Sequence, residues 1–408
     1  MKNDAQHDVA VVGAGPAGLA AALGIACQGA KVAIVGPPTA AADNRTAALF
    51  TGSLQLVRSL GAWDDCSASG EPLLAIRIID DTGSLLRAPE VLFTAAEVGL
   101  DAFGCNIPNV VLTQALRRQA AANGAITLLE TSVTSLDIGS ASAALRLADG
   151  TSLSARLVIG ADGRKSLCRS AAGIGTREWA YEQSALTCTF AHQRPHDGIS
   201  TEFHRLAGPL TVVPSPGKSS SLVWVDRPAI ARRLAGLDET AFRGALEARL
   251  QGLLGPIREI GPRSVFPLSG LVAEGAARNR VALVGEAAHV IPPIGAQGLN
   301  LGLRDAALIA DCVGDALRLG GDIGAPQTLE TYARARRLDI VTRAWSIDLL
   351  NRSLISGFLP VQLIRGLGLH ALKTIGPLRR LAIREGLAPS YVAPSLMRQD
   401  PALLREAP

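Results

Sequence analysis

Three glycine-rich segments carry the residue types that bind nucleotide phosphates and sugar hydroxyls. They read GAGPAG at residues 13–18, GADGRKS at 160–166 and GEAAHVIPPIGAQGLN at 285–300. Glycine lets a ligand approach the backbone closely, and a carboxylate such as Asp162 or Glu286 can accept hydrogen bonds from ligand hydroxyls. The three segments therefore predict the binding of a nucleotide-like ligand.

The first segment has the spacing of a pyrophosphate-binding turn. Gly13 would permit the tight turn, Gly15 would let the pyrophosphate approach the backbone, and Gly18 would let the following helix pack close to the strand. A helix that begins at Pro16 and Ala17 would offer free N–H groups and the positive end of its dipole to the phosphates. We therefore assign these five residues to cofactor binding.

The context of this turn supports the assignment. An apolar strand at 9–12 precedes it, and a second strand, KVAIV at 31–35, follows the helix. A plain strand–turn–helix is the alternative, since glycine is common in the chain. The acid that usually ends the second strand and binds the ribose is missing, because Gly36 stands there. The backbone or the segment 43–49 would have to hold the ribose instead.

The second segment follows an apolar strand, LVIGA at 157–161. Asp162 and Gly163 would either contact ligand hydroxyls or order a phosphate-binding turn. An ordinary Asp-Gly turn that leaves a strand is the alternative.

The third segment follows the apolar run RVALVG at 280–285. Its prolines and glycines predict a stiff loop whose backbone passes close to a flat ring. A helix beginning near Leu299 and Asn300 would direct its N-terminus at negative charge on the ligand. The candidate residues of this segment are Gly285, Glu286, Pro293, Gly295, Gln297, Gly298, Leu299 and Asn300.

Strands and helices must alternate to position these turns, so we predict an α/β fold with a Rossmann-like domain. The 408 residues are 48% hydrophobic and 19% charged, which is typical of a large folded protein. The net charge is +4, and no basic run interleaved with aromatic residues suggests a nucleic acid partner. The six cysteines are scattered without metal-ligand spacing, so we expect mostly buried thiols in a reducing compartment and no metal site.

In this order and spacing, the three segments resemble the FAD-dependent aromatic-ring monooxygenases of the para-hydroxybenzoate hydroxylase fold. Further segments resemble the ubiquinone-biosynthesis hydroxylases within that superfamily, and the similarity extends from about residue 7 to residue 390. These segments are DNRTAALFTGSLQLVRSLGAW at 43–63, IPNVVLTQAL at 107–116, YEQSALTCTFAH at 181–192, TEFHRLAGPLTVVP at 201–214 and SLVW at 221–224.

The resemblance implies FAD as cofactor and adds residues to its site. Arg45 matches an arginine near the flavin or pyrophosphate, and Asn109 matches a polar contact to the ribityl region. Asp162 and Gly163 match a turn implicated in both FAD and nicotinamide binding. Glu286 stands where the family more often has aspartate, and a carboxylate one methylene longer could still reach a ribityl hydroxyl.

The resemblance also implies a domain organisation. We expect a discontinuous FAD-binding domain at 1–72, 100–178 and 258–340, and a β-sheet substrate domain at 73–99 and 179–257. A C-terminal helical region would follow at 341–408.

The implied activity is hydroxylation of the aromatic ring of a polyprenylated phenol in ubiquinone biosynthesis. NAD(P)H would bind transiently and reduce FAD, and O₂ would form a flavin C4a-hydroperoxide that hydroxylates the ring. Asp162, Arg164 and His289 are candidate nicotinamide contacts. Tyr181, His192 and His204 are titratable residues of the substrate domain, but each is more typical of a structural residue, so we assign no catalytic residue.

Two other functions stay open. One is a monooxygenase of the same fold that acts on a soluble aromatic in catabolism or secondary metabolism. The other is a flavin-stabilised scaffold in a biosynthetic complex, against which the intact GADG and GAQGLN segments argue. A flavin halogenase is disfavoured because its WxWxIP signature is absent.

The C-terminal residues 353–384 contain no acid but five basic residues, interleaved with apolar residues at helical spacing. They predict either a helix packed on the FAD domain with a solvated basic face, or a surface that rests on an anionic membrane. With no signal peptide pattern and no apolar run of the ~18 residues that span a membrane, we expect a cytoplasmic protein, with peripheral contact at the inner face of the membrane as an option. The residues of this pattern are Ile364, Arg365, Leu367, Leu372, Lys373, Ile375, Leu378, Arg379, Arg380, Leu381 and Arg384.

Overall fold

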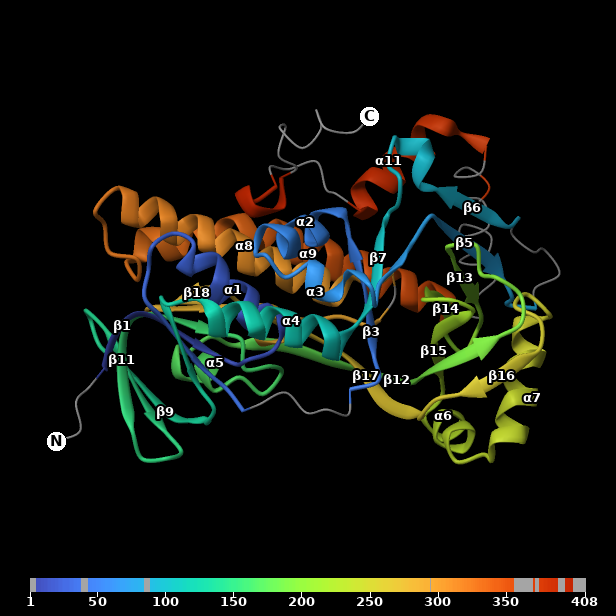
Figure 1. Cartoon of the computed structure of the whole chain (residues 1–408), viewed down its shortest axis with the longest axis horizontal. Helices are drawn as coiled ribbons and strands as arrows, with labels where there is room; N and C mark the ends of the chain where they lie inside the picture. Colours follow the sequence, from blue (N-terminus) through green and yellow to red (C-terminus); the bar gives the residue numbers. More distant parts are fainter. Residues whose placement is uncertain are drawn as a thin grey trace.

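The structure is a computed structural model, and it describes residues 5–37, 43–83, 89–293, 295–355, 370, 374–387 and 393–398. A layered α/β part lies beside a large, mostly antiparallel sheet (Figure 1), in which β13 and β5 pair in parallel. The predicted fold class, an α/β Rossmann-like part with a β-sheet substrate part, is confirmed.

The α/β part is built on a sheet with the strand order β18-β19-β11-β1-β2-β8, to which β10 and β9 add an antiparallel edge. Strands β19, β11, β1, β2 and β8 are parallel. Their bounds, and those of the edge strands, are β1 Ala5–Val12, β2 Val32–Val35, β8 Ile126–Leu129, β9 Val133–Ile138, β10 Ala143–Leu147, β11 Ser152–Gly160, β18 Ala277–Arg278 and β19 Val281–Leu283.

Helices cover both faces of this sheet. Helix α1 packs against α8 and α4, and it is buried on all sides from Gly18 to Ala26. Gly24 makes this possible, because a Cβ at its position would lie 3.1 Å from the Cβ of Ala310 on α8. The helices are α1 Pro16–Ala26, α2 Thr51–Ser59, α3 Asp64–Ser67, α4 Asn109–Ala122, α5 Leu167–Ala171, α8 Gln297–Arg318 and α9 Pro326–Ile355.

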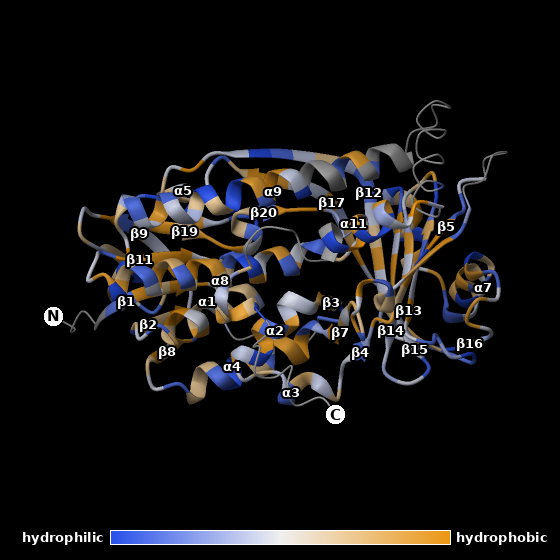
Figure 2. Ribbon diagram, turned by 90° about the horizontal axis from the view of Figure 1, so that it is seen from above, coloured by the Kyte–Doolittle hydropathy of each residue, from blue (hydrophilic) through white to orange (hydrophobic). Residues whose placement is uncertain are grey.

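The second sheet has the order β20-β17-β12-β15-β14-β13-β5-β6, with β16 beside β12. Strands β12 and β17 are long, and β12 extends from the α/β part into the second sheet (Figure 2). The bounds are β5 Ala75–Asp80, β6 Val91–Thr94, β12 Thr176–His192, β13 Ile199–His204, β14 Leu210–Ser215, β15 Ser219–Asp226, β16 Ile257–Ile260, β17 Ser264–Ala273 and β20 His289–Val290.

Alternation along the strands separates two cores in this sheet. Leu186, Cys188 and Trp224 pack with helices α6 (Pro228–Ala235) and α7 (Glu239–Leu250) on one face. Ala185 and Val225 belong to a smaller cluster on the opposite face. That second face is the one available to a substrate, because helices cover the first.

Short elements connect the two parts. A small sheet has the order β3-β7-β4, and the antiparallel pairing of β3 with β7 places residues 46–50 beside 104–108. The strands of this sheet are β3 Thr46–Phe50, β4 Glu71–Pro72 and β7 Gly104–Pro108. The short helices of the chain are η1 Ala95–Val98, η2 Gly285–Ala287 and η3 Ser395–Met397, of which η3 packs on α2 and α8. The domain boundaries stay a prediction, and three elements cross them: β12 passes residue 178, β16 passes residue 257, and α9 passes residue 340.

The C-terminal pattern lies partly outside the described residues, since 356–369 and 371–373 are not described. Helix α11 (Gly376–Leu387) is described, and its Arg379 is ion-paired with Glu97 over the ring of Phe93. Leu378 and Leu381 are 40% and 56% exposed. The packed face of α11 therefore includes a basic residue, while two of its leucines face outward.

His192 at the end of β12 leads to a pH prediction. Burial lowers its pKa, assisted by the charges of His196 and Lys218 and opposed by hydrogen bonds to backbone oxygens of Arg194 and Ser219. The unfolded chain therefore binds a proton at pH values where the folded chain does not, so this group removes stability as the pH falls below the ordinary histidine value of about 6.5. We expect His192→Gln to lose less stability than the wild type between pH 7.5 and 5.5. Urea unfolding at the two pH values measures this, and an equal loss in both proteins would contradict it.

Candidate active site

The three glycine-rich turns meet at one edge of the first sheet. Parallel register places Val12 of β1 beside Gly160 of β11, and Gly160 beside Leu283 of β19. Backbone hydrogen bonds continue past the strand ends, from Ala161 N–H to Val12 O (2.8 Å) and from Val284 N–H to Gly160 O (2.9 Å). The carboxyl ends of adjacent parallel strands are where ligands bind in such sheets.

The first turn has the steric features expected of a pyrophosphate site. Gly13 has φ +115°, and a Cβ there would lie 2.2 Å from Ala161 O. A Cβ on Gly18 would lie 2.0 Å from Gly13 O, so the α1 backbone packs directly on the turn. By contrast, among the described residues other than its chain neighbours, none has an atom within 4 Å of the Cβ position of Gly15, which is the N-cap of α1. Open space above Gly15, at a helix N-terminus, suits a phosphate. Pro16 and Ala17 begin that helix.

The absence of a ribose-binding carboxylate after β2 has a steric cause. A Cβ at Gly36 would lie 2.6 Å from Ala14 N, so no side chain fits at the end of β2. Asp43 lies nearby in the chain, but Arg45 already forms a bidentate pair with it at 2.8 Å. The Asp43 and Glu286 charges and the Asp43 hydrogen bond raise the pKa of Arg45, against the effect of burial.

Asn109 completes this group from the start of α4. Its Nδ2 donates to Asp43 at 3.3 Å, which is a long hydrogen bond. Its Oδ1 is buried and has no hydrogen-bond partner among the described residues. An orphaned buried acceptor beside Arg45 fits a ligand hydroxyl, which supports the predicted role of Asn109 in cofactor binding.

Asp162 orders the second turn. Its Oδ1 accepts from Ser166 Oγ at 2.5 Å and its Oδ2 accepts from Cys168 N–H at 3.0 Å. The Asp162 carboxylate therefore orders its own turn rather than contacting ligand hydroxyls. Gly163, with φ +77°, leaves open space beside this turn. Arg169 then joins two turns, donating to Ala287 O and to Arg164 O at 2.9 Å each.

The third turn brings backbone groups to the same edge. Gly285, with φ +60°, donates its N–H to Asp305 at 2.9 Å, and the exposed Glu286 follows. Gly295 has φ +64° with open space at its Cβ position. Helix α8 begins at Gln297, two residues before the predicted start, because Ala296 adopts a left-handed conformation with φ +53°. The N–H groups of Gly298 and Leu299 lie in the first turn, where they have no partner within the helix.

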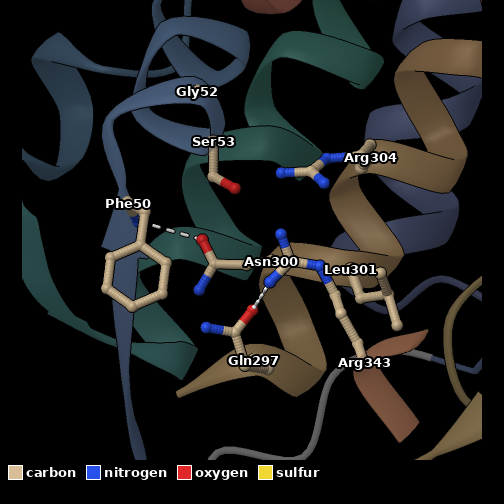
Figure 3. A pocket seen from close by; sticks show the side chains of 8 residues that line it. All are labelled: Phe50, Gly52, Ser53, Gln297, Asn300, Leu301, Arg304 and Arg343. Carbon is tan, nitrogen blue, oxygen red and sulfur yellow. Dashed lines mark hydrogen bonds between the residues drawn. The ribbon is translucent and has the colours of Figure 1, made fainter. Parts of the chain in front are cut away.

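The Asn300 side chain hydrogen-bonds to other parts of the protein rather than pointing into open space (Figure 3). Its Oδ1 accepts from Phe50 N–H at 2.9 Å, and its Nδ2 donates to Ala48 O at 2.8 Å and Ala296 O at 2.7 Å. Asn300 therefore ties β3 to the start of α8.

A cavity of about 420 Å³ lies between these turns and the open face of the second sheet. Arg45, Arg164, Glu286 and Pro293 line it from the α/β part, and β12, β15 and β17 form the opposite wall. The volume is typical of a small-molecule site. The wall formed by the sheet is largely apolar, with Leu222, Val223 and Phe266 among its residues, whereas the wall from the α/β part carries charged side chains.

The polar atoms of the sheet wall were not predicted from the sequence. Thr187 Oγ1 on β12 is buried and has no hydrogen-bond partner among the described residues. Burial raises the pKa of the neighbouring Cys188 thiol to about 12, so it stays protonated and is no nucleophile at neutral pH. The alternating pattern of SALTCTFAH indicated which residues share a face, but not which face meets the cavity.

The titratable candidates lie away from this cavity. Tyr181 Oη donates to Asp348 at 2.6 Å, His204 contacts Glu202 at 2.8 Å, and His192 is held by Arg194 O and Ser220 Oγ. His289 is 2% exposed and hydrogen-bonds to Asp305 at 2.7 Å.

Glu286 provides a direct test of the cofactor site. It lies on the cavity wall and acts electrostatically on Arg45. We expect Glu286→Ala to weaken FAD binding about 10-fold or more, since a hydrogen bond to a charged group contributes ~1.5–3 kcal/mol. Glu286→Asp, the shorter carboxylate, is the matched control and should retain most of the affinity. Fluorescence titration of apo-protein with FAD measures both, and wild-type affinity in Glu286→Ala would remove this role.

Comparison with known proteins extends these observations. The sequence matches the FAD binding domain family over residues 6–346. It is 36% identical to the ubiquinone hydroxylase of Rhodospirillum rubrum over 414 aligned residues, which cover 99% of this chain and 94% of that protein. It is 31% identical to the 3-demethoxyubiquinol 3-hydroxylase of Escherichia coli, covering 93% and 98%.

A solved structure shows the same fold. The p-nitrophenol 4-monooxygenase of Pseudomonas putida superposes with a TM-score of 0.78 at 18% identity, over 96% of this chain and 100% of that one. The open positions above Gly15, Gly163 and Gly295 and the unpaired Asn109 oxygen fit an extended dinucleotide along the sheet edge. The chain belongs to the family of FAD-dependent aromatic-ring monooxygenases that includes the ubiquinone-biosynthesis hydroxylases.

Proposed function

We propose that this protein hydroxylates the aromatic ring of a polyprenylated phenol in ubiquinone biosynthesis, using NAD(P)H and O₂. The observation that carries the proposal is the cavity of about 420 Å³ between the FAD-binding turns and the second sheet. On its wall lies the Thr187 hydroxyl, which no described residue pairs with. The R. rubrum and E. coli relatives support the choice of substrate class over a soluble aromatic.

The residues would hold and shield the reactants. The turns at Gly15 and Gly285 would bind the pyrophosphate and ribityl groups, and the loop at Pro293 and Gly295 would pass beside the flavin ring. FAD would supply the redox chemistry, since it accepts a hydride from NAD(P)H and activates O₂, of which one atom enters the ring and the other leaves as water. The apolar sheet wall would exclude water, and Thr187 Oγ1 would hydrogen-bond to the phenol hydroxyl.

The nicotinamide would bind only transiently at the mouth of the cavity. Arg164 is exposed there and donates to Ser269 Oγ at 2.7 Å. His289 is buried against Asp305, which leaves Arg164 and the Asp162 turn as the contacts we propose.

The test uses the FAD-loaded protein with a prenylated phenol and a short, soluble phenol in parallel. We expect oxidation of NADH or NADPH and a product one oxygen atom heavier, labelled from ¹⁸O₂, with the prenylated substrate preferred. Preference for the soluble phenol would favour catabolic chemistry. Reduction of the flavin without product from either phenol would refute the proposal and favour the scaffold.

Thr187 variants test the substrate contact within the same assay. Thr187→Val keeps the shape but removes the hydroxyl, so kcat/KM for the phenol should fall about 2- to 10-fold, as expected for one neutral hydrogen bond. Thr187→Ser restores a hydroxyl and should recover most of the loss. Equal rates in all three proteins would remove Thr187 from the site.

We also propose peripheral contact of helix α11 with an anionic membrane. Among the described residues no helix is long and apolar enough to cross a membrane. The exposed Leu378 and Leu381 lie beside the exposed Arg380 and Arg384, an arrangement that favours the surface of anionic lipids. Replacing both leucines with glutamate should reduce sedimentation with phosphatidylglycerol vesicles. Leu319→Glu, at an 86% exposed site after α8, is the control. Unchanged sedimentation of the double variant would refute this contact.

A further inference from the structure

The loop at 285–297, which carries much of the cofactor site, is attached at both ends to one buried ionic cluster. We call it the Asp339 cluster, and its members come from α8 and α9. They are Arg304, Asp305, Arg336, Asp339 and Arg343. Asp305, Arg336 and Asp339 are at most 1% exposed.

One branch of the cluster leads to the start of the loop. Arg336 Nη1 donates to Asp339 at 2.6 Å, and Arg336 Nε donates to Asp305 Oδ1 at 2.5 Å. The other oxygen of Asp305 accepts from Gly285 N–H at 2.9 Å and contacts His289 Nε2 at 2.7 Å. Asp339 therefore acts on the Gly285 turn through Arg336 and Asp305.

The second branch leads to the end of the loop. Arg343 Nε donates to Asp339 Oδ1 at 2.8 Å, and its Nη1 donates to Gln297 Oε1 (Figure 3). Gln297 Nε2 in turn donates to Gly295 O at 3.1 Å. Because Gln297 is the first residue of α8, this branch holds both the left-handed glycine of the loop and the helix N-terminus.

A buried ionic cluster of this kind contributes little net stability, because removing charges from water is unfavourable. What it does provide is a fixed geometry, since each carboxylate oxygen has directed donors. Burial alone would raise the pKa of Asp305, but the charges of Arg336 and His289 and the hydrogen bonds it accepts hold it below its usual value. The carboxylate is therefore ionised, and the network is intact at neutral pH.

We propose that Asp339 is a positioning residue for the cofactor site, which sets the distance between the Gly285 turn and the N-terminus of α8. Asp339 lies on α9 and lines neither the cavity nor the phosphate turn. The inference rests on the FAD site and not on the substrate we propose. It can therefore fail while the hydroxylase assay succeeds, and the reverse.

The experiment measures the FAD dissociation constant, the flavin midpoint potential and the melting temperature of the apo-protein. Asp339→Asn keeps the size and removes the charge. We expect about 10-fold weaker FAD binding and a shifted midpoint potential, because the helix N-terminus and the loop no longer hold a fixed position beneath the ring. Asp226→Asn breaks another buried ion pair, with Arg205 at 2.8 Å, and is the matched control. It should lower the melting temperature without changing either flavin measurement.

A second pair of variants separates positioning from general destabilisation. Arg343→Met cuts only the branch to Gln297, and its side chain is 12% exposed, so it is the milder change. It should weaken FAD binding, and its effect should shrink at least about threefold when Gln297 is already alanine, because residues in one network are not additive. If Asp339→Asn fails to fold, this pair tests the second branch.

Two results would overturn the proposal. The first is a folded Asp339→Asn protein with wild-type FAD affinity and midpoint potential, whose melting temperature falls as in Asp226→Asn. The second is independence of the Arg343→Met and Gln297→Ala effects on FAD binding, which would mean that Arg343 does not act through Gln297.

Discussion

Asp305→Ala is expected to lower the free energy of unfolding of the apo-protein by about 3–5 kcal/mol, the range for breaking a buried ion pair from one side. Asp305 is completely buried and accepts hydrogen bonds from Arg336, His289 and Gly285. Its removal leaves the Arg336 guanidinium, itself 1% exposed, without this carboxylate. Urea unfolding of the apo-protein measures the change.

The control for Asp305 lies on the same helix. Asp315→Ala removes a carboxylate that is 69% exposed and pairs with Arg318. An exposed pair of this kind contributes less than about 1 kcal/mol. Asp305→Asn should fall between the two, because its amide oxygen can still accept from Gly285. Equal stability of Asp305→Ala and Asp315→Ala would contradict the importance of the buried carboxylate.

Gly13→Ala is expected to abolish FAD binding and to destabilise the apo-protein as well. Its φ of +115° is unfavourable for any residue with a Cβ, and the added atom would lie 2.2 Å from Ala161 O and 2.6 Å from the Ala161 carbonyl carbon. The backbone of β11 must therefore move away from β1. Positive φ alone contributes roughly 1–3 kcal/mol of strain, to which the collision adds.

Gly15→Ala separates binding from folding. Gly15 has the ordinary φ of −78°, and no described residue apart from its chain neighbours has an atom within 4 Å of its Cβ position. We expect a normal apo-protein melting temperature and weakened FAD binding, because the methyl group occupies the space of the pyrophosphate. A Gly15→Ala protein with wild-type FAD affinity would place the pyrophosphate elsewhere.

Local sequence determined the backbone of the cofactor site. Positive φ at Gly13, Gly163, Gly285 and Gly295, and the open space at Gly15, follow from residue types whose conformational range is known without a fold. Strand and helix periodicity indicated that the turns follow parallel strands, and parallel strands bring their carboxyl ends together. The fold class could be predicted for that reason, whereas the family was predicted from the resemblance of the three segments in their order and spacing.

Only the tertiary structure decided which side chains occupy the site. Asp162 orders its own turn, Asn300 hydrogen-bonds to β3, and Thr187 lines the cavity without a hydrogen-bond partner in the described part of the chain. These outcomes depend on distances between elements, which local periodicity does not contain. Helix α8 also begins at Gln297 rather than near the predicted Leu299. Its N-cap is Ala296 in a left-handed conformation, and alanine is not a residue type that signals the start of a helix.

The long-range ion pairs could not be predicted from the sequence either. Asp305 and Arg336 are 31 residues apart in the chain, and Glu97 and Arg379 are 282 apart. A chain with 35 arginines offers many possible partners for each acid, and only the packing of α8 on α9, and of α11 on η1, selects one. The sequence by itself determined that this protein binds a dinucleotide along a sheet edge. The tertiary structure decided which charges hold that edge in place, because charge pairing depends on position in space rather than on order along the chain.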